Sequence, residues 1–132
     1  MVISLKKEEL TYTSCYCEEN VWLICDRIRN GDPDSLGDFH VVFISNEDRM
    51  IPLWRQSAGK PEFDDERVVW DYHVIQVDAA RRLVLDLDTT LDFPCDFNVY
   101  LASAIKNERL FIPRFRRRFR RRGRRTKLSL FL

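Results

Sequence analysis

The stretch "VVWDYHVIQVDAARRLVLDLD", residues 68–88, contains two runs of β-branched and large apolar residues separated by a short polar and small-residue segment. Two runs of this composition on either side of a short turn predict an antiparallel β-hairpin. We expect strands at residues 68–77 and 82–88, with the turn centred on Ala79 and Ala80.

This hairpin places a histidine opposite an aspartate. With the turn centred on the alanine pair, His73 lies directly across from Asp86. Directly opposed residues point to the same face, with Cβ atoms about 4.5–5.5 Å apart. A carboxylate at that distance fixes the tautomer of an imidazole and stabilises its charged form. The prediction depends on register, because a slip of one residue would put the two side chains on opposite faces.

The acids of the second strand have two interpretations. Asp86 and Asp88 alternate with apolar residues and share a face with Val84, although aspartate is disfavoured in strands. On a solvated face the two carboxylates need no partners, whereas on a buried face they must be paired. The presence of His73 favours the buried interpretation.

A second stretch, "TSCYCEENVWLIC" (residues 13–25), contains three cysteines and begins a helical pattern. Val21, Ile24, Cys25 and Ile28 follow the spacing of one apolar helix face. The pattern predicts a helix that starts near Cys17, has acidic residues in its first turn and ends at "NGDPD".

Cys17 is the candidate nucleophile, because a thiolate is stabilised at a helix N-terminus and near an imidazolium. Together with a histidine and an aspartate it forms a set suited to acyl transfer from an amide. We expect Cys15 to line the approach and Cys25 to belong to the core. Inert packing of all these thiols is the alternative. Zinc binding is disfavoured because Cys15 and Cys17 have C-x-C spacing without a second pair, so we expect no metal.

Further elements follow from the remaining apolar runs. Residues 40–46 form a predicted strand, and residues 51–56 are expected to pair back onto it as a hairpin. Residues 97–105 are expected to form a short helix. The chain of 132 residues, 45% hydrophobic and 33% charged, is long enough for one globular domain.

Composition also bears on location. No apolar run approaches the ~20 residues of a membrane span, and the first residues do not resemble a secretory signal. We therefore expect a cytoplasmic protein, also present in the nucleus, with reduced cysteines and a monomeric state. We expect no contact with membranes.

Charge is divided unevenly along the chain. Residues 1–113 contain 12 Lys and Arg against 21 Asp and Glu, whereas residues 114–132 contain nine Arg, one Lys and no acid. We interpret residues 1–113 as a single domain and residues 114–132 as a basic, arginine-rich tail. Arginines interleaved with Phe115 and Phe119 are also typical of nucleic-acid-binding or nuclear-import segments, which gives an alternative function.

Four blocks of the sequence resemble the protein N-terminal glutamine amidohydrolase family. They occur in the family's order and cover most of the acidic part of the chain: "SCYCEENVW" (14–22), "VFISNEDRMIPLW" (42–54), "VVWDYHVI" (68–75) and "LDLDTTLDFPC" (85–95). The resemblance implies an α+β, papain/transglutaminase-like cysteine-hydrolase fold. In it, a helix bearing the cysteine packs on an antiparallel sheet bearing the histidine and the aspartate.

By this resemblance Cys17, His73 and Asp86 are the catalytic residues. The family converts the N-terminal glutamine of proteins and peptides to glutamate and releases ammonia, a step of the N-degron pathway, and it uses no cofactor. Selection of an N-terminal residue requires acceptors for the α-ammonium and a closed end to the pocket. By proximity, Glu18 and Asp71 are candidates for the first role.

Two tryptophans, Trp54 and Trp70, are candidates for the pocket wall, with local packing as the alternative for each. The resemblance weakens after Phe119, where family members continue well beyond this chain. We therefore interpret the chain as a C-terminally truncated or alternative form. A catalytically inactive form is the corresponding alternative.

Overall fold

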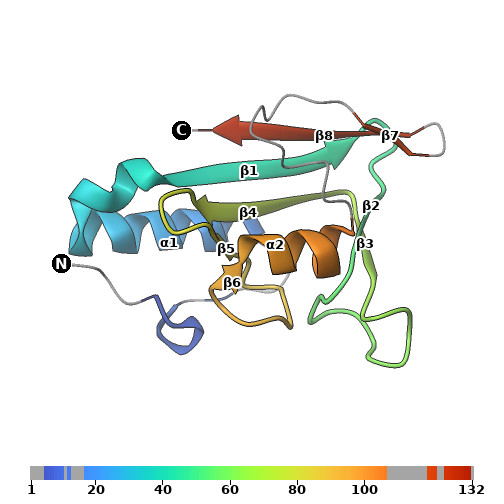
Figure 1. Cartoon of the computed structure of the whole chain (residues 1–132), viewed down its shortest axis with the longest axis horizontal. Helices are drawn as coiled ribbons and strands as arrows, with labels where there is room; N and C mark the ends of the chain where they lie inside the picture. The colour runs from blue at the N-terminus through green and yellow to red at the C-terminus, as the bar shows by residue number, and fades with distance from the viewer. Residues whose placement is uncertain (1–4, 11, 13–16, 107–118, 122–123, 132) are drawn as a thin grey trace.

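The computed structural model describes residues 5–10, 12, 17–106, 119–121 and 124–131, shown in Figure 1. A six-stranded antiparallel sheet in the order β6-β5-β4-β1-β8-β7 forms its centre, and β2 pairs with β3 in a separate two-stranded sheet. The strands are β1 (Phe39–Asn46), β2 (Ile51–Leu53), β3 (Val68–Trp70), β4 (Tyr72–Asp78), β5 (Leu83–Leu85), β6 (Cys95–Asp96), β7 (Phe119–Arg121) and β8 (Arg124–Phe131).

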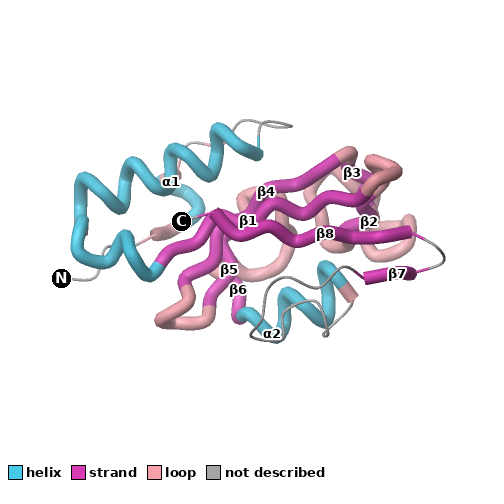
Figure 2. The backbone as a smooth tube through the Cα atoms, turned by 90° about the horizontal axis from the view of Figure 1, so that it is seen from above, coloured by secondary structure: helices cyan, strands magenta, loops and turns pink. Residues whose placement is uncertain are grey.

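Helices cover both faces of the large sheet, as Figure 2 shows. They are α1 (Cys17–Gly31), α2 (Phe97–Tyr100) and the π-helical segment η3 (Leu101–Ile105) that continues it, with short 3₁₀ turns η1 (Lys7–Glu9) and η2 (Pro33–Asp38). No helix within the described ranges is both long and apolar enough to cross a membrane. The arrangement is α+β, as predicted.

Two apolar clusters fill the spaces on either side of the sheet. On the α1 side, Ile24 and Ile28 pack with Phe39, Leu85 and Leu87. The cluster on the α2 side is larger and joins the large sheet to β2 and η3; its buried members are Val42, Ile44, Ile51, Leu53, Ile75, Val77, Val84, Cys95, Tyr100, Leu101, Ala104 and Ile105. Both faces of the large sheet are thus covered by helices or loops, which is why apolar side chains point to both sides of it.

The helix predicted from the "CEENVWLIC" pattern is confirmed as α1, which begins at Cys17. Val21, Ile24 and Ile28 are buried as expected. Cys25 is only partly buried and accepts a hydrogen bond from the side chain of Gln76 on β4. The helix predicted at residues 97–105 is also confirmed.

The predicted hairpin between residues 40–46 and 51–56 is wrong. The first run is β1, but β1 pairs with β4 along one edge and with β8 along the other. Asn46 bonds the backbone of Met50 with both ends of its side-chain amide. The chain therefore turns away after β1, and β2 pairs with β3 in the second sheet.

The hairpin that contains the histidine exists, but its register differs from the prediction by two residues. Val77 pairs with Val84, and Gln76 with Leu85. The turn occupies four residues, 79–82, because the Asp78 carboxylate accepts a hydrogen bond from the Arg81 backbone and Arg82 adopts a left-handed φ of 57°. An offset of two preserves the face to which each side chain points, which is why the histidine and the aspartate still meet.

The C-terminal part of the chain contributes strands. Residues 124–131 form β8, which pairs with β1, and β7 pairs with β8 at the edge of the large sheet. The expected boundary between residues 113 and 114 lies outside the described residues.

The loop between β2 and β3 contains a close backbone approach at Gly59. A Cβ atom at this position would lie 2.4 Å from the carbonyl oxygen of Glu66. The same carbonyl accepts a hydrogen bond from the backbone N–H of Gln56. The absence of a side chain at Gly59 therefore lets the loop fold back and fix Gln56.

Gly59→Ala is expected to destabilise the protein by about 1–3 kcal/mol, the usual cost of forcing an atom into a packed site. Gly37→Ala is the matched control, because a Cβ at Gly37 would meet nothing within 4 Å. Thermal and urea unfolding of the two variants measure the difference. Equal stability of the two would contradict the close approach.

Candidate active site

His73 lies in the interior of the large sheet. It sits on β4, paired with Ile44 of β1, and its side chain is 1% exposed. The indole of Trp70 stacks on the imidazole, with ring centroids 5.3 Å apart and planes inclined by 15°. The ring is therefore covered on one face by an aromatic side chain from β3.

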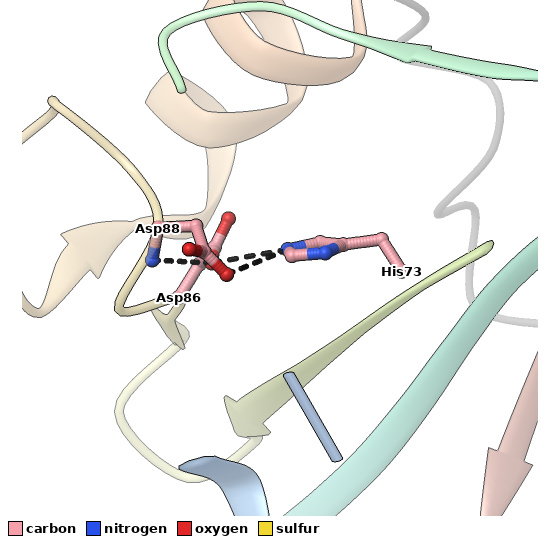
Figure 3. A group of neighbouring side chains, drawn as sticks. All are labelled: His73, Asp86 and Asp88. Atoms are coloured by element: carbon pink, nitrogen blue, oxygen red, sulfur yellow. Dashed lines mark hydrogen bonds and ion pairs between the residues drawn. The ribbon is translucent and has the colours of Figure 1, made fainter. Parts of the chain in front are cut away.

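Asp86 meets the imidazole edge, as predicted, although it lies just after β5 rather than within a paired strand. Its Oδ1 is 3.1 Å from His73 Nε2, the contact drawn in Figure 3. Oδ1 also accepts the backbone N–H of Asp88 at 2.9 Å. Oδ2 accepts the Tyr100 hydroxyl at 2.7 Å and the Gln56 amide at 3.2 Å.

The two groups form a buried ion pair. Burial lowers the pKa of His73, but the charge and the hydrogen bond of Asp86, together with smaller effects of the same kinds from Cys17, outweigh burial and raise it to about 10. Burial raises the pKa of Asp86, but the imidazolium charge, its hydrogen bond and the Tyr100 hydroxyl together hold it below its ordinary value. Each charge thus favours the other, as expected for a paired and fully hydrogen-bonded buried carboxylate.

Asp88 lies on the same buried side, its Oδ2 4.0 Å from His73 Nε2 (Figure 3). Its Oδ1 accepts the Tyr12 hydroxyl at 2.5 Å. Burial raises the pKa of Asp88, against the opposing effect of the Tyr12 hydrogen bond. The interpretation in which the two acids of this strand face water is therefore wrong, since both carboxylates are buried and both have partners.

Cys17 is the first residue of α1 and is half-buried. It contributes to the raised pKa of His73 both as a hydrogen-bond partner and as a charge. Asp86 occupies Nε2, while Nδ1 is buried and, among the residues described, has no aligned hydrogen-bond partner. Nδ1 is thus the nitrogen available to the thiol. Catalytic hydrogen bonds in ligand-free enzymes are often long or poorly aligned.

The other cysteines differ in environment. Burial raises the pKa of the Cys95 thiol to about 11, assisted by the charge of Asp96. Burial also raises the pKa of Cys25. Both thiols are thus disfavoured as nucleophiles at neutral pH. Cys15 lies outside the described residues.

The two acidic candidates for amine recognition have different surroundings. Glu18 follows Cys17 on α1, is exposed, and accepts a hydrogen bond from the Tyr72 hydroxyl. This bond is the largest cause that raises the pKa of Tyr72, to about 12. Asp71 is exposed and accepts the backbone N–H of Tyr72. Both acids therefore converge on Tyr72, the residue before His73.

The two tryptophans also differ. Trp70 stacks on His73 and donates its indole N–H to Gln56 Oε1 at 3.1 Å. Trp54 instead lies beneath the Lys106 ammonium, 4.8 Å from the ring centroid, and its backbone N–H bonds Ala104. Trp70 is thus part of the histidine's surroundings, whereas Trp54 packs against the end of η3.

Two residues of the site, Gln56 and Tyr100, were not identified from the sequence. Gln56 and Tyr100 both donate to Asp86 Oδ2 and both are fully buried. Gln56 is the last residue of the strand predicted at residues 51–56, and nothing in that pattern indicates that its amide is buried. The one hint for Tyr100 is a hydroxyl on the apolar face of a short helix, since buried hydroxyls require partners.

His73, Asp86 and Asp88 also form a cluster whose potential ligand atoms lie within 4.8 Å of one another. Both Asp86 oxygens already accept hydrogen bonds from Gln56, Tyr100 and the Asp88 backbone. A cation would also compete with the proton on His73, whose pKa is about 10. The chemistry of this donor set fits a proton-bearing ion pair better than a metal centre.

A thiol that interacts with an imidazole, together with a buried carboxylate on one ring nitrogen, is typical of thiol-dependent acyl-transfer enzymes. Residues 12–131 match the N-terminal glutamine amidase family, so the chain belongs to this family. The match includes β8, beyond the part that the sequence motifs covered.

Individual proteins that resemble the chain belong to the same family. The chain is 44% identical over 117 residues to the protein N-terminal glutamine amidohydrolases of Bos taurus and Homo sapiens, 86% of this chain in each case. It is 44% identical over 118 residues, 87% of the chain, to that of Drosophila melanogaster. The alignments cover 55%, 56% and 57% of these relatives, so the chain spans just over half the length of the curated relatives it matches.

Stability is expected to depend on pH through the ion pair. The folded-state pKa of His73 is above its ordinary value of 6.5, so its stabilisation is complete below about pH 6.5 and is lost as the pH rises through about 10. The pKa of Asp86 is below 3.8, so its contribution is present above that pH and is lost in acid.

Asp86→Asn is expected to cost about 3–5 kcal/mol, because it leaves a buried imidazole without its charge partner. Its free energy of unfolding should also lack the decline that the wild type shows between about pH 6.5 and 10. Urea unfolding across that range measures both curves. Parallel curves for the two proteins would show that the pair does not carry the charge assigned to it.

Proposed function

We propose that this chain hydrolyses the side-chain amide of an N-terminal glutamine in proteins or peptides, giving glutamate and ammonia. One observation carries the proposal. In a member of this family, the buried His73–Asp86 pair leaves Nδ1 of the imidazole available beside a cysteine at a helix start. The relatives are protein N-terminal glutamine amidohydrolases, and their name supplies the substrate class.

The proposed mechanism uses Cys17, His73 and Asp86 as a catalytic triad. The Cys17 thiolate attacks the carboxamide carbon, and backbone N–H groups near the helix start hold the developing oxyanion. The His73 imidazolium protonates the departing nitrogen, so that the C–N bond breaks, ammonia leaves and a thioester remains. The neutral imidazole then takes a proton from water, which attacks the thioester and releases the glutamate and the thiolate. Asp86 keeps the ring oriented and stabilises its charge throughout.

We also propose that the fold is of the papain/transglutaminase-like type. Its support is the helix that starts at the nucleophile and packs on an antiparallel sheet that carries the histidine. The aspartate differs from a simple strand residue, because it stands in the turn that follows β5.

Glu18 is the favoured acceptor for the substrate's α-ammonium group. It is adjacent to the nucleophile and exposed, and its carboxylate is already oriented by the Tyr72 hydroxyl. Asp71 lies between β3 and β4 rather than next to Cys17 in the chain, and one of its oxygens accepts the backbone N–H of Tyr72. An exposed carboxylate next to the nucleophile in the chain is suited to a small cationic group.

We further propose that the protein acts as a monomer in the cytoplasm and nucleus. The three described cysteines are free thiols, which is consistent with a reducing compartment.

Ammonia release from a short Gln-initiated peptide tests the function. We expect release from the free-amine peptide, no release from its N-acetylated copy, and a loss of at least about 10³-fold in Cys17→Ala, since nucleophile removal costs that much or more in comparable enzymes. Glu18→Gln and Asp71→Asn in the same assay distinguish the two candidate amine acceptors. Substitution of the residue that binds the amine should raise KM with kcat nearly unchanged, and substitution of the other should leave both values close to those of the wild type.

Circular dichroism and gel filtration establish that each sample is folded. A folded wild type that releases no ammonia would refute the proposed activity for this chain. Equal release from the acetylated peptide would instead refute recognition of the N-terminal amine.

A further inference from the structure

Gln56 occupies an unusual place for an amide side chain. It lies in the loop after β2, is 0% exposed, and forms an isolated antiparallel bridge with Thr89. The neighbouring backbone N–H of Ser57 bonds the Asp88 carbonyl at 2.7 Å. Gln56 is therefore held beside the turn that carries Asp86 and Asp88.

Both ends of the Gln56 amide are used, and their assignment is fixed by chemistry. The Trp70 indole N–H can only donate, so the group it meets at 3.1 Å must be the amide oxygen. The amide nitrogen then faces Asp86 Oδ2 at 3.2 Å. This matches the need of a buried carboxylate for donors. A side chain that serves both neighbours must offer one donor and one acceptor at its end, which the amide does at every pH.

These contacts close a ring of four residues. Trp70 covers a face of the His73 imidazole, and Asp86 holds its Nε2 edge. Gln56 is hydrogen-bonded to both of these residues, to Trp70 through its amide oxygen and to Asp86 through its amide nitrogen. Because an imidazole is oriented by two side-chain torsions, restraints on face and edge together define its plane.

We infer that Gln56 is a positioning residue that orients His73 toward Cys17 by tying Trp70 to Asp86. This inference rests on the proposed function only in taking Cys17 and His73 as the reacting pair. Gln56 itself contacts neither the thiol nor the imidazole in the interactions described, so its effect passes through Asp86 and Trp70.

A glutamate at position 56 would test the role by a change of protonation. A protonated Glu side chain keeps an O–H donor for Asp86 and a carbonyl oxygen for Trp70. An ionised one loses the donor and places a second negative charge against Asp86, where like charges repel. The function of Gln56→Glu should thus recover as the pH falls, whereas Gln56→Met has neither donor nor acceptor at any pH.

Other titrating groups contact the Asp86 carboxylate or its partners, and the experiment must account for them. They are His73 at Nε2, the Tyr100 hydroxyl at Oδ2, and Asp88, which lies beside His73 and is bonded by Tyr12. Cys17 acts on His73 from α1, Lys7 acts on Asp88, and Cys95 of β6 interacts with Asp86 by charge. All of them are present in the wild type and in the four glutamine variants, so the ratios of these variants to the wild type cancel their direct effects.

Gln76 provides a matched control within the same chain. It is a glutamine on β4 that is also 0% exposed. Its amide nitrogen bonds the Cys25 thiol, and no described contact joins it to Asp86 or Trp70. Gln76→Glu and Gln76→Met therefore place the same new side chains at a buried position that lies outside the ring of four residues.

The experiment measures the rate at which iodoacetamide alkylates Cys17, followed by peptide mapping in a mass spectrometer, between pH 5 and 8. The proteins are the wild type, His73→Ala, and the two variants at each glutamine, with circular dichroism confirming that each is folded. This readout follows the thiol–imidazole pair and does not require amide hydrolysis.

We expect His73→Ala to lower the wild-type rate and Gln56→Met to lower it about 10-fold at every pH, a part of the ~10²–10⁴ that a positioned acid–base group contributes. The ratio of Gln56→Glu to wild type should rise at least several-fold as the pH falls from 8 to 5. The corresponding ratios for the Gln76 variants should stay flat.

Three outcomes would overturn the inference: a wild-type rate for Gln56→Met, a pH response of Gln56→Glu no steeper than that of Gln76→Glu, or a Cys17 rate that does not depend on His73. If Gln56→Met does not fold, the comparison of the two glutamate variants decides alone. The expected pattern without ammonia release from Gln peptides would refute the proposed function and leave the inference standing.

Discussion

The ion pair between His73 and Asp86 is the contact around which the rest of the site is arranged. A carboxylate with 2% of its surface exposed is costly to bury unless its lone pairs are used. Here they are used by groups from four different segments: β4, the loop after β2, helix α2 and the turn after β5. The pair thereby adds buried side-chain hydrogen bonds to the backbone hydrogen bonds and apolar packing that already join these elements.

This arrangement explains how one sheet serves both stability and chemistry. The apolar clusters cover the two sheet faces. The ring formed by Gln56, Trp70, His73 and Asp86 adjoins the larger cluster, against which Trp70 packs. Since Nε2 is committed to the aspartate, the geometry leaves a single ring nitrogen for the thiol. An imidazolium with a pKa of about 10 is suited to deliver a proton to a departing amine, while its carboxylate partner stays ionised.

The helix that carries Cys17 and the strand that carries His73 could be predicted from the sequence, because the apolar spacing of the helix and the β-branched composition of the strand are regular. The meeting of His73 and Asp86 was predicted from a register that is wrong by two residues. It succeeded because an even offset preserves the face of a strand. The hairpin expected for β2 failed, since both edges of β1 are taken by strands distant in sequence, which local pattern cannot reveal. Gln56 and Tyr100 were missed for the same reason, because their importance comes from long-range contacts with Asp86.

The charge state of His73 tests this account most directly. The chain has two histidines, so an NMR titration of the imidazole signals, with His40→Gln for assignment, isolates His73 without ambiguity. The account predicts that His73 remains an imidazolium through pH 8 and loses its proton near pH 10. A His73 that titrates near its ordinary value of 6.5 would contradict the buried ion pair and, with it, the proposed geometry of the site.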